Sequence, residues 1–168
     1  YDKELIVEAA KASGLDQKLL ETSDEKAPNI FLYSMAFSSP SPATSGLYIY
    51  NELFDIQSKV VRAVAEKSPC VIIGRCADYL LQDRPNCLRV FIHGSLENRM
   101  DRVARRQSIC LSEARDLILK TDKKRGNYYR SFTGRKWNDM EHYDLAIDSS
   151  FFGIEQTISL LTDAIHDK

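Results

Sequence analysis

The residues best suited to chemistry form a basic stretch between Asn98 and Lys136. Twelve Lys or Arg stand there against four Asp or Glu, so the stretch carries about +8. The rest of the chain must then carry about −9, because the net charge of the whole is −1. Positive charge concentrated on a near-neutral protein favours a polyanionic ligand, either nucleotide phosphates or nucleic acid. The alternative is a pair of solvated helices with basic outer faces.

The first half of this stretch predicts an amphipathic helix over residues 96–107, with Ser95 as its N-cap. Three arginines share one face of that helix, and a fourth lies nearby: Arg99, Arg102, Arg106 and Arg105. Like charges this close repel, and an anionic ligand would relieve the repulsion.

The second half predicts a helix over residues 112–125, capped by Ser112. Asp122 and Arg125 lie one turn apart, a spacing that predicts an ion pair holding the arginine ready for a phosphate. An exposed pair of small energetic consequence is the alternative. The residues from Arg125 to Trp137 mix basic and aromatic types, which suits either stacking on single-stranded nucleic acid or a closing lid.

A further arginine, Arg75, directly follows Gly74 and an apolar run over residues 70–73. This places it just past the carboxyl end of a predicted strand, where open α/β sheets bind ligands. Its guanidinium is suited to bidentate contact with a phosphate, although it could equally tie a loop to a neighbouring carboxylate.

The elements that must position these residues predict one α/β domain. The apolar runs that indicate strands buried on both faces cover residues 70–73, 88–92 and 145–147. A predicted helix follows each of them, over residues 77–82, 96–107 and 153–166, and this alternation indicates a parallel sheet. Earlier in the chain we expect helices over 3–13, 16–23 and 51–67, the last capped by Asn51, and a loop over 38–50.

Composition narrows the class of protein further. The chain has 168 residues, 43% of them hydrophobic, which is enough for one compact core. No apolar run approaches the roughly 20 residues that cross a bilayer, and no signal-peptide pattern is present, so a cytoplasmic protein without a membrane partner is expected. The four cysteines and three histidines show no metal-ligand spacing, and no metal site is predicted.

Seven segments together resemble the cytidylate kinase-like family, a branch of the P-loop nucleoside monophosphate kinases. They are YDKELI at 1–6, EKAPNIFLY at 25–33, VIIGRCADYLL at 71–81, RPNCLRVFI at 84–92, TDKKRGNYY at 121–129, FTGRKW at 132–137 and YDLAIDSS at 143–150. The resemblance implies a three-layer, P-loop kinase-type parallel sheet with helices on both faces and a helical lid. It implies transfer of the ATP γ-phosphoryl group to a pyrimidine nucleotide, CMP or dCMP, with ATP and Mg²⁺ as cofactors and nucleotides as small-molecule partners.

The resemblance also implies a layout and a set of site residues. The chain would be a single domain over 1–168, with an acceptor-binding helical part over 3–69, a core over 70–97 and 143–168, and a basic lid over 98–138. The implied catalytic residues are Arg102, Arg106 and Arg125. The implied substrate-binding residues are Asp2, Arg75 and Asp122. Further phosphate candidates are Arg105, Lys123, Lys124 and Arg130.

Two departures from the family pattern stand in the sequence. Cys76 replaces the aspartate that follows Gly-Arg in cytidylate kinases, and no G-x-x-x-x-G-K-[ST] phosphate loop occurs in the 168 residues. We therefore expect the first strand and the phosphate loop to precede Tyr1, and the chain alone to be inactive. The alternatives are an inactive nucleotide- or RNA-binding module and a related kinase with a small non-nucleotide acceptor.

Overall fold

The computed structural model of the chain describes residues 1–2 and 44–166. It divides into two compact units, Tyr1–Leu80 and Leu81–Lys168, and each is described by itself. The helices predicted over 3–13 and 16–23 lie outside the described residues, as does the first part of the loop predicted over 38–50.

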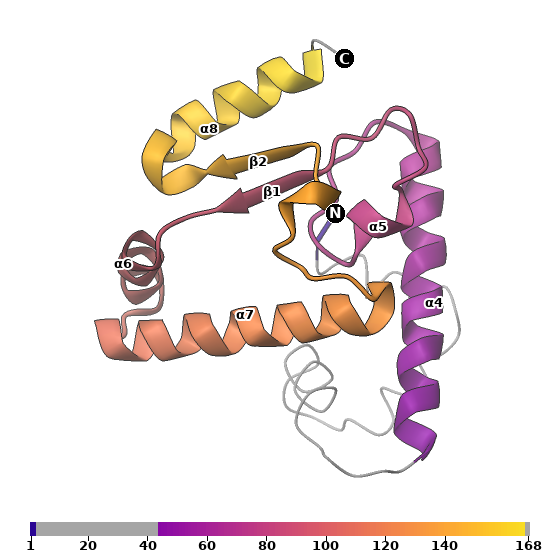
Figure 1. The fold of residues 1–168 in the computed structure, drawn as a ribbon, viewed down its shortest axis with the longest axis horizontal. Coiled ribbons are helices and arrows are strands. Elements are labelled where there is room, and N and C mark those ends of the chain that lie inside the picture. The colour runs from indigo at the N-terminus through magenta and orange to yellow at the C-terminus, as the bar shows by residue number, and fades with distance from the viewer. Residues whose placement is uncertain (3–43, 167–168) are drawn as a thin grey trace. The chain divides into compact units, whose positions relative to one another are not determined.

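The first unit is built on helix α4, Thr44–Lys67, and the short helix α5, Ala77–Leu80 (Figure 1). Helix α4 begins seven residues before the predicted helix, so the prediction of a loop over 44–50 is wrong and Asn51 lies inside the helix. Gly46 costs this helix only about 1 kcal/mol. Burial of Val61 and Val64 stabilises the helix whatever its first turn contains.

Residues 70–73 do not form the predicted buried strand. The amino group of Tyr1 donates to the Val71 carbonyl at 2.7 Å, and the Ile73 amide donates to the Tyr1 carbonyl at 2.9 Å. Tyr1 alone among the described residues pairs with this run, and a strand needs a longer neighbour to satisfy its backbone. Val71 is accordingly 70% exposed and Ile73 60% exposed.

The second unit contains a parallel pair of strands, β1 (Val90–His93) and β2 (Leu145–Asp148), in the register Val90↔Leu145. The strand predicted over 145–147 is confirmed, whereas β1 begins two residues later than predicted. Arg89 and Asp144 fix the register just before both strands. The Arg89 guanidinium donates to both carboxylate oxygens of Asp144, and the Arg89 amide donates to one of them.

Helices lie on both sides of this sheet, as the sequence predicts. In Figure 1, α8 (Ser149–His166) lies on one side and α7 (Leu111–Thr133) on the other, while α6 (Leu96–Gln107) follows β1. A short 3-10 helix, η1 (Met140–His142), precedes β2. Helix α8 starts at Ser149 rather than 153, and its backbone leaves the helical region at Gly153. The strands are less buried than predicted. In β1, for example, Ile92 is 53% exposed.

The two basic helices begin in different ways. Ser95 caps α6 as predicted, since its hydroxyl accepts from the Asn98 amide at 3.2 Å. Ser112 does not cap α7, which begins at Leu111 after the N-cap residue Cys110 and runs to Thr133. Glu113 supplies the capping carboxylate there: it accepts from the Cys110 amide at 3.0 Å, and this hydrogen bond lowers the pKa of Glu113.

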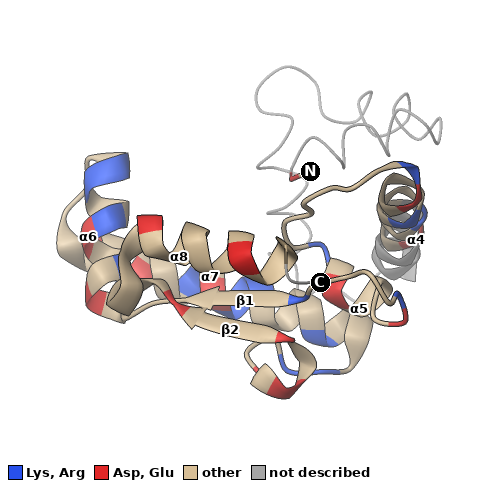
Figure 2. Ribbon diagram, turned by 90° about the horizontal axis from the view of Figure 1, so that it is seen from above, with Lys and Arg blue, Asp and Glu red and all other residues tan. Residues whose placement is uncertain are grey.

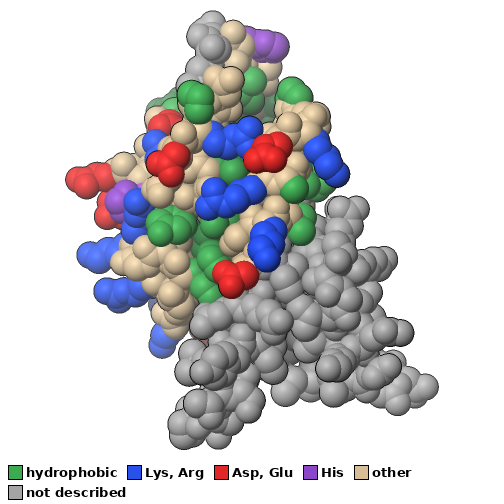
Figure 3. Space-filling view, turned by 90° about the vertical axis from the view of Figure 1, so that its right-hand side faces the viewer, with side chains coloured by type: hydrophobic (Ala, Val, Ile, Leu, Met, Phe, Trp, Pro, Cys, Tyr) green, Lys and Arg blue, Asp and Glu red, His purple; other side chains and the backbone are tan. Residues whose placement is uncertain are grey.

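The exposed surface of α4 carries charges of both signs. Asp55, Lys59, Arg62, Glu66 and Lys67 are all exposed, and Figure 3 shows basic and acidic side chains interspersed on that side. Among the residues of α4 whose exposure is described, from 54 onward, the exposed charges therefore form no surface of a single sign. Among the helices of residues 44–166, none is long and apolar enough to cross a membrane.

Candidate phosphate-binding site

A hollow of about 550 Å³ lies in the second unit, at the carboxyl end of β1. It is bordered by α6, α7, the loop after α7 and the start of α8. Its lining residues are Phe91, Ile92, His93, Gly94, Arg99, Arg102, Asp122, Arg125, Gly126, Asn127, Arg130, Lys136, Trp137, Asn138 and Ser149. The carboxyl ends of parallel strands are where α/β proteins place ligands.

The hollow is strongly basic. Five basic side chains line it against a single carboxylate, that of Asp122. They come from two helices and one loop: Arg99 and Arg102 from α6, Arg125 and Arg130 from α7, and Lys136 from the loop. Helix α6 packs against α7, and Figure 2 shows Lys and Arg on both helices. Convergent cations of this kind favour an anionic ligand such as a phosphate chain.

The one carboxylate of the hollow is paired with Arg99. Arg99 Nη1 lies 2.8 Å from Asp122 Oδ2, and Nη2 donates to Oδ1 at 2.8 Å, so the contact is bidentate. Both side chains are a little over one quarter exposed. The predicted pair of Asp122 with Arg125 is wrong, because the carboxylate faces the neighbouring helix and meets Arg99 there.

Arg125 lies instead beside the ring of Trp137, with its guanidinium carbon 6.0 Å from the ring centroid. The ring also meets Phe91 of β1 in a T-shaped contact with centroids 5.6 Å apart. An aromatic ring and a cation therefore share one part of the hollow.

Gly94, one of the residues that line the hollow, lies where β1 meets the start of α8. A Cβ on Gly94 would lie 2.5 Å from the Ser150 hydroxyl oxygen, closer than real atoms approach. That hydroxyl accepts from the Ser95 amide at 2.7 Å, and the Ser149 hydroxyl donates to the His93 carbonyl at 2.8 Å. These hydrogen bonds hold the ends of both strands together, and a side chain at position 94 would have to displace the Ser150 hydroxyl from its hydrogen bond with the Ser95 amide.

The structure brings some of the site residues predicted from the sequence together. Those that line the hollow are Arg102, Asp122, Arg125 and Arg130. Those in the same unit that do not line it are Arg105, Arg106, Lys123 and Lys124. Arg105 Nε donates to the Asp101 carbonyl of its own helix at 3.2 Å. Asp2 and Arg75 belong to the first unit, where Asp2 is exposed and Arg75 is half-buried.

Arg75 occupies a strained turn. Gly74, Arg75 and Cys76 have φ values of 72°, 59° and 54°, three successive residues in the left-handed region. Non-glycine residues rarely adopt this conformation, and such strain concentrates at functional sites. Cys76 anchors the turn, since its side chain is 3% exposed, and burial raises the pKa of its thiol to about 12.

Sequence reasoning missed several residues of the hollow. Lys136 and Arg99 belong to the basic stretch, but the spacing of charges does not show which of its members converge. Asn127 carries no pattern of its own and lines the hollow from α7, whereas His93 and Ser149 line it because the ends of β1 and β2 meet there. A signal for His93 and Ser149 was available: His93 directly follows the strand predicted over 88–92, and Ser149 is the second residue after the strand predicted over 145–147.

A parallel sheet with helices on both sides, joined to a basic hollow at a strand end, defines an α/β protein of kinase-like fold. Residues 1–151 match the cytidylate kinase-like family, and the chain belongs to that family. A solved structure, described as an uncharacterized protein from Eubacterium ventriosum, is similar with a TM-score of 0.67 and 28% identity. The similarity covers 70% of this chain and 74% of that one.

Curated relatives carry the name cytidylate kinase. The protein from Methanopyrus kandleri is 30% identical over 112 residues, which cover 62% of this chain and 58% of that protein. The protein from Methanosarcina acetivorans is 27% identical over 112 residues, which cover 66% of this chain and 62% of that protein. The chain therefore matches about three-fifths of the length of these relatives.

Proposed function

We propose that the protein is a nucleoside monophosphate kinase that transfers the γ-phosphoryl group of ATP to a pyrimidine nucleotide, CMP or dCMP. The observation that carries the proposal is the hollow in which five basic side chains face one carboxylate. Membership of the cytidylate kinase-like family supports the choice of substrate class. The name of the curated relatives supports the choice of cytosine as the acceptor base.

The chemistry requires positioning and positive charge more than acid–base groups. A terminal phosphate oxygen of the acceptor attacks the γ-phosphorus of ATP, the bond from that phosphorus to the β–γ bridging oxygen breaks, and ADP leaves. Charge on the transferred group is stabilised by fixed cations. We assign this role to Arg102 and Arg125, which line the hollow, and retain Arg106, Arg105, Arg130, Lys123 and Lys124 as further phosphate contacts. Asp2 and Arg75 are proposed to bind the acceptor.

Asp122 has a different role in this proposal from the one that its spacing suggests. Its two carboxylate oxygens are both engaged by Arg99. We therefore treat Asp122 as a positioning residue that fixes Arg99 in the wall of the hollow, and through it the packing of α6 on α7.

The described residues do not fit a protein-held Mg²⁺ site. No group of three or more His, Cys, Asp or Glu within the described part of the chain is arranged to hold a metal ion. The hollow's one carboxylate is committed to Arg99. Mg²⁺ enters the proposal as the ion that accompanies the ATP phosphates, as it commonly does in kinases.

The test is a coupled assay of ADP formation by the polypeptide that the native gene encodes. With Mg·ATP, we expect turnover with CMP or dCMP to exceed turnover with UMP, AMP and GMP. Arg102→Gln should lower kcat/KM by about tenfold or more. The matched control Arg115→Gln should not, because Arg115 lies on α7 and does not line the hollow. The absence of transfer to every nucleoside monophosphate would contradict the proposal.

A further inference from the structure

Trp137 is the only tryptophan of the 168 residues, and it lines the basic hollow. It lies in the loop between α7 and η1, next to Lys136, and its side chain is half-buried. Trp137 thus places a large aromatic ring among the basic side chains that line the hollow. A half-buried ring of this size either packs against neighbouring side chains or contacts a ligand.

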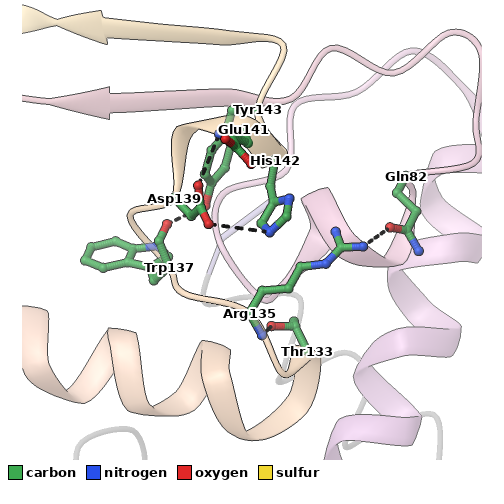
Figure 4. A network of polar contacts seen from close by, with 8 residues as sticks. All are labelled: Gln82, Thr133, Arg135, Trp137, Asp139, Glu141, His142 and Tyr143. Carbon is green, nitrogen blue, oxygen red and sulfur yellow. Dashed lines mark hydrogen bonds and ion pairs between the residues drawn. The ribbon is translucent and has the colours of Figure 1, made fainter.

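The loop that carries Trp137 is held rigidly at several points (Figure 4). The Arg135 amide donates to the Thr133 hydroxyl at 3.1 Å, and the Arg135 guanidinium donates to Gln82 Oε1 at 2.9 Å. The Tyr143 hydroxyl donates to the Trp137 carbonyl at 2.8 Å. Because these bonds fix the backbone on both sides of Trp137, the ring is preorganised for binding.

Figure 4 shows the Trp137 ring pointing away from the Arg135 side chain that reaches Gln82. Phe91 meets the ring edge-on rather than by stacking, with an interplanar angle of 74°. The Arg125 guanidinium carbon lies 6.0 Å from the centroid, at the outer limit of a cation–π contact. Neither neighbour is stacked closely on the ring.

We propose that Trp137 is a stacking platform for the nucleobase of a nucleoside phosphate whose phosphates bind the cations of the hollow. The inference rests on the proposed function and deepens it by naming the residue that contacts the base. Base stacking on an aromatic ring accepts any base, because every base has a π-face. The weak contact of Arg125 with the ring yields to the base, and its guanidinium is then available to phosphate oxygens.

The experiment separates the base from the phosphates. Binding of ATP, CMP and inorganic tripolyphosphate to the intact polypeptide and its variants is measured by calorimetry, and in the parent protein also by the fluorescence of Trp137. We expect Trp137→Leu to weaken binding of ATP or CMP by about tenfold. Binding of tripolyphosphate, which has the charge but no base, should change by less than twofold. The nucleotide with the larger loss is the one whose base occupies the platform.

Two further variants control for folding and for aromatic character. Trp137→Phe keeps a π-face, so it should retain most of the affinity while removing the fluorescence signal that the nucleotide perturbs. Phe151→Leu makes a similar change at a residue that is 82% exposed and outside the hollow, and it should leave nucleotide affinity unchanged.

The outcomes distinguish this inference from the proposed function. If Trp137→Leu binds ATP and CMP as tightly as the parent protein, the platform is wrong and the kinase proposal stands. If it loses affinity for tripolyphosphate equally, the ring supports the loop rather than the base, and the platform is again wrong. If the parent protein binds no nucleotide, both proposals are overturned.

Discussion

Arg99 on α6 and Asp122 on α7 form a bidentate ion pair across the two basic helices, with both N–O distances at 2.8 Å. The pair lies in the wall of the hollow, and its two side chains are partly shielded from water. It neutralises one of the five cations there and leaves the other four to face a ligand. The same contact fixes how α6 packs on α7, so a structural pair also shapes the electrostatics of the hollow.

Removing one partner of this pair should cost stability. We expect Asp122→Asn to lower the free energy of unfolding by about 1 kcal/mol, because a bidentate, partly shielded pair exceeds the median surface pair. Urea denaturation measures this change. Arg99→Met and the double variant complete a thermodynamic cycle that isolates the coupling between the two side chains.

The chain offers a matched control for that prediction. Asp116 lies on α7 as well, but its contact with Arg115 is 3.8 Å long and its side chain is 82% exposed. Asp116→Asn should therefore change stability by less than about 0.5 kcal/mol. An equal loss in both variants would show that the charge of α7, rather than the contact with Arg99, matters.

Local features of the fold could be predicted from the sequence, whereas long-range ones could not. Ser95 and the helix that follows are set by capping and amphipathic spacing, both visible within a few residues. The partner of Asp122 is 23 residues away, and nothing in the spacing distinguishes it from Arg125. The run at 70–73 has strand composition, but a strand depends on a neighbour that its own sequence does not specify.

The membership of the site also depends on long-range contacts. The basic stretch predicts an anionic ligand, and it contains all five cations that line the hollow together with seven that do not. Arg102 and Arg105 illustrate the difficulty: they lie three residues apart on α6, yet only Arg102 lines the hollow. Which arginine faces inward is decided by the packing of α6 on α7, a tertiary contact that charge patterning does not encode.

The capping contrast between the two basic helices gives a second stability prediction. Ser95→Ala should lower the free energy of unfolding by about 1 kcal/mol, because the Asn98 amide loses its acceptor. Ser112→Ala should have an effect below about 0.5 kcal/mol, since Ser112 is exposed and does not cap α7. Thermal or urea denaturation of both variants measures the difference, and a larger loss for Ser112→Ala would contradict the observed helix start.

The cations of the hollow predict a salt-dependent affinity for phosphates. We expect Arg130→Gln to weaken binding of ATP by about tenfold at low ionic strength and by less at high ionic strength, because screening already reduces the attraction there. Calorimetry at two salt concentrations measures this. Arg115→Gln removes a charge from the same helix outside the hollow and serves as the control. If it weakened ATP binding as much as Arg130→Gln, the affinity would depend on the overall positive charge of the helix rather than on contact of Arg130 with the phosphates.

The buried thiol of Cys76 predicts the order in which the cysteines react. Its pKa, raised to about 12 by burial, keeps Cys76 protonated at pH 8, whereas Cys110 is exposed. Because thiolates are the reactive form, iodoacetamide should modify Cys110 first and Cys76 only on unfolding. Mass spectrometry of digested samples follows each site.

The same shift fixes the sign of a pH dependence. A thiol with a pKa near 9 in the unfolded chain and about 12 in the folded one binds more protons when folded between these values. Its contribution to stability is therefore fully present below pH 9 and is lost as the pH rises toward 12. Comparison of the parent with Cys76→Ala above pH 9 tests this, since the variant should lose less stability with rising pH. An identical slope in both proteins would contradict the role assigned to this thiol.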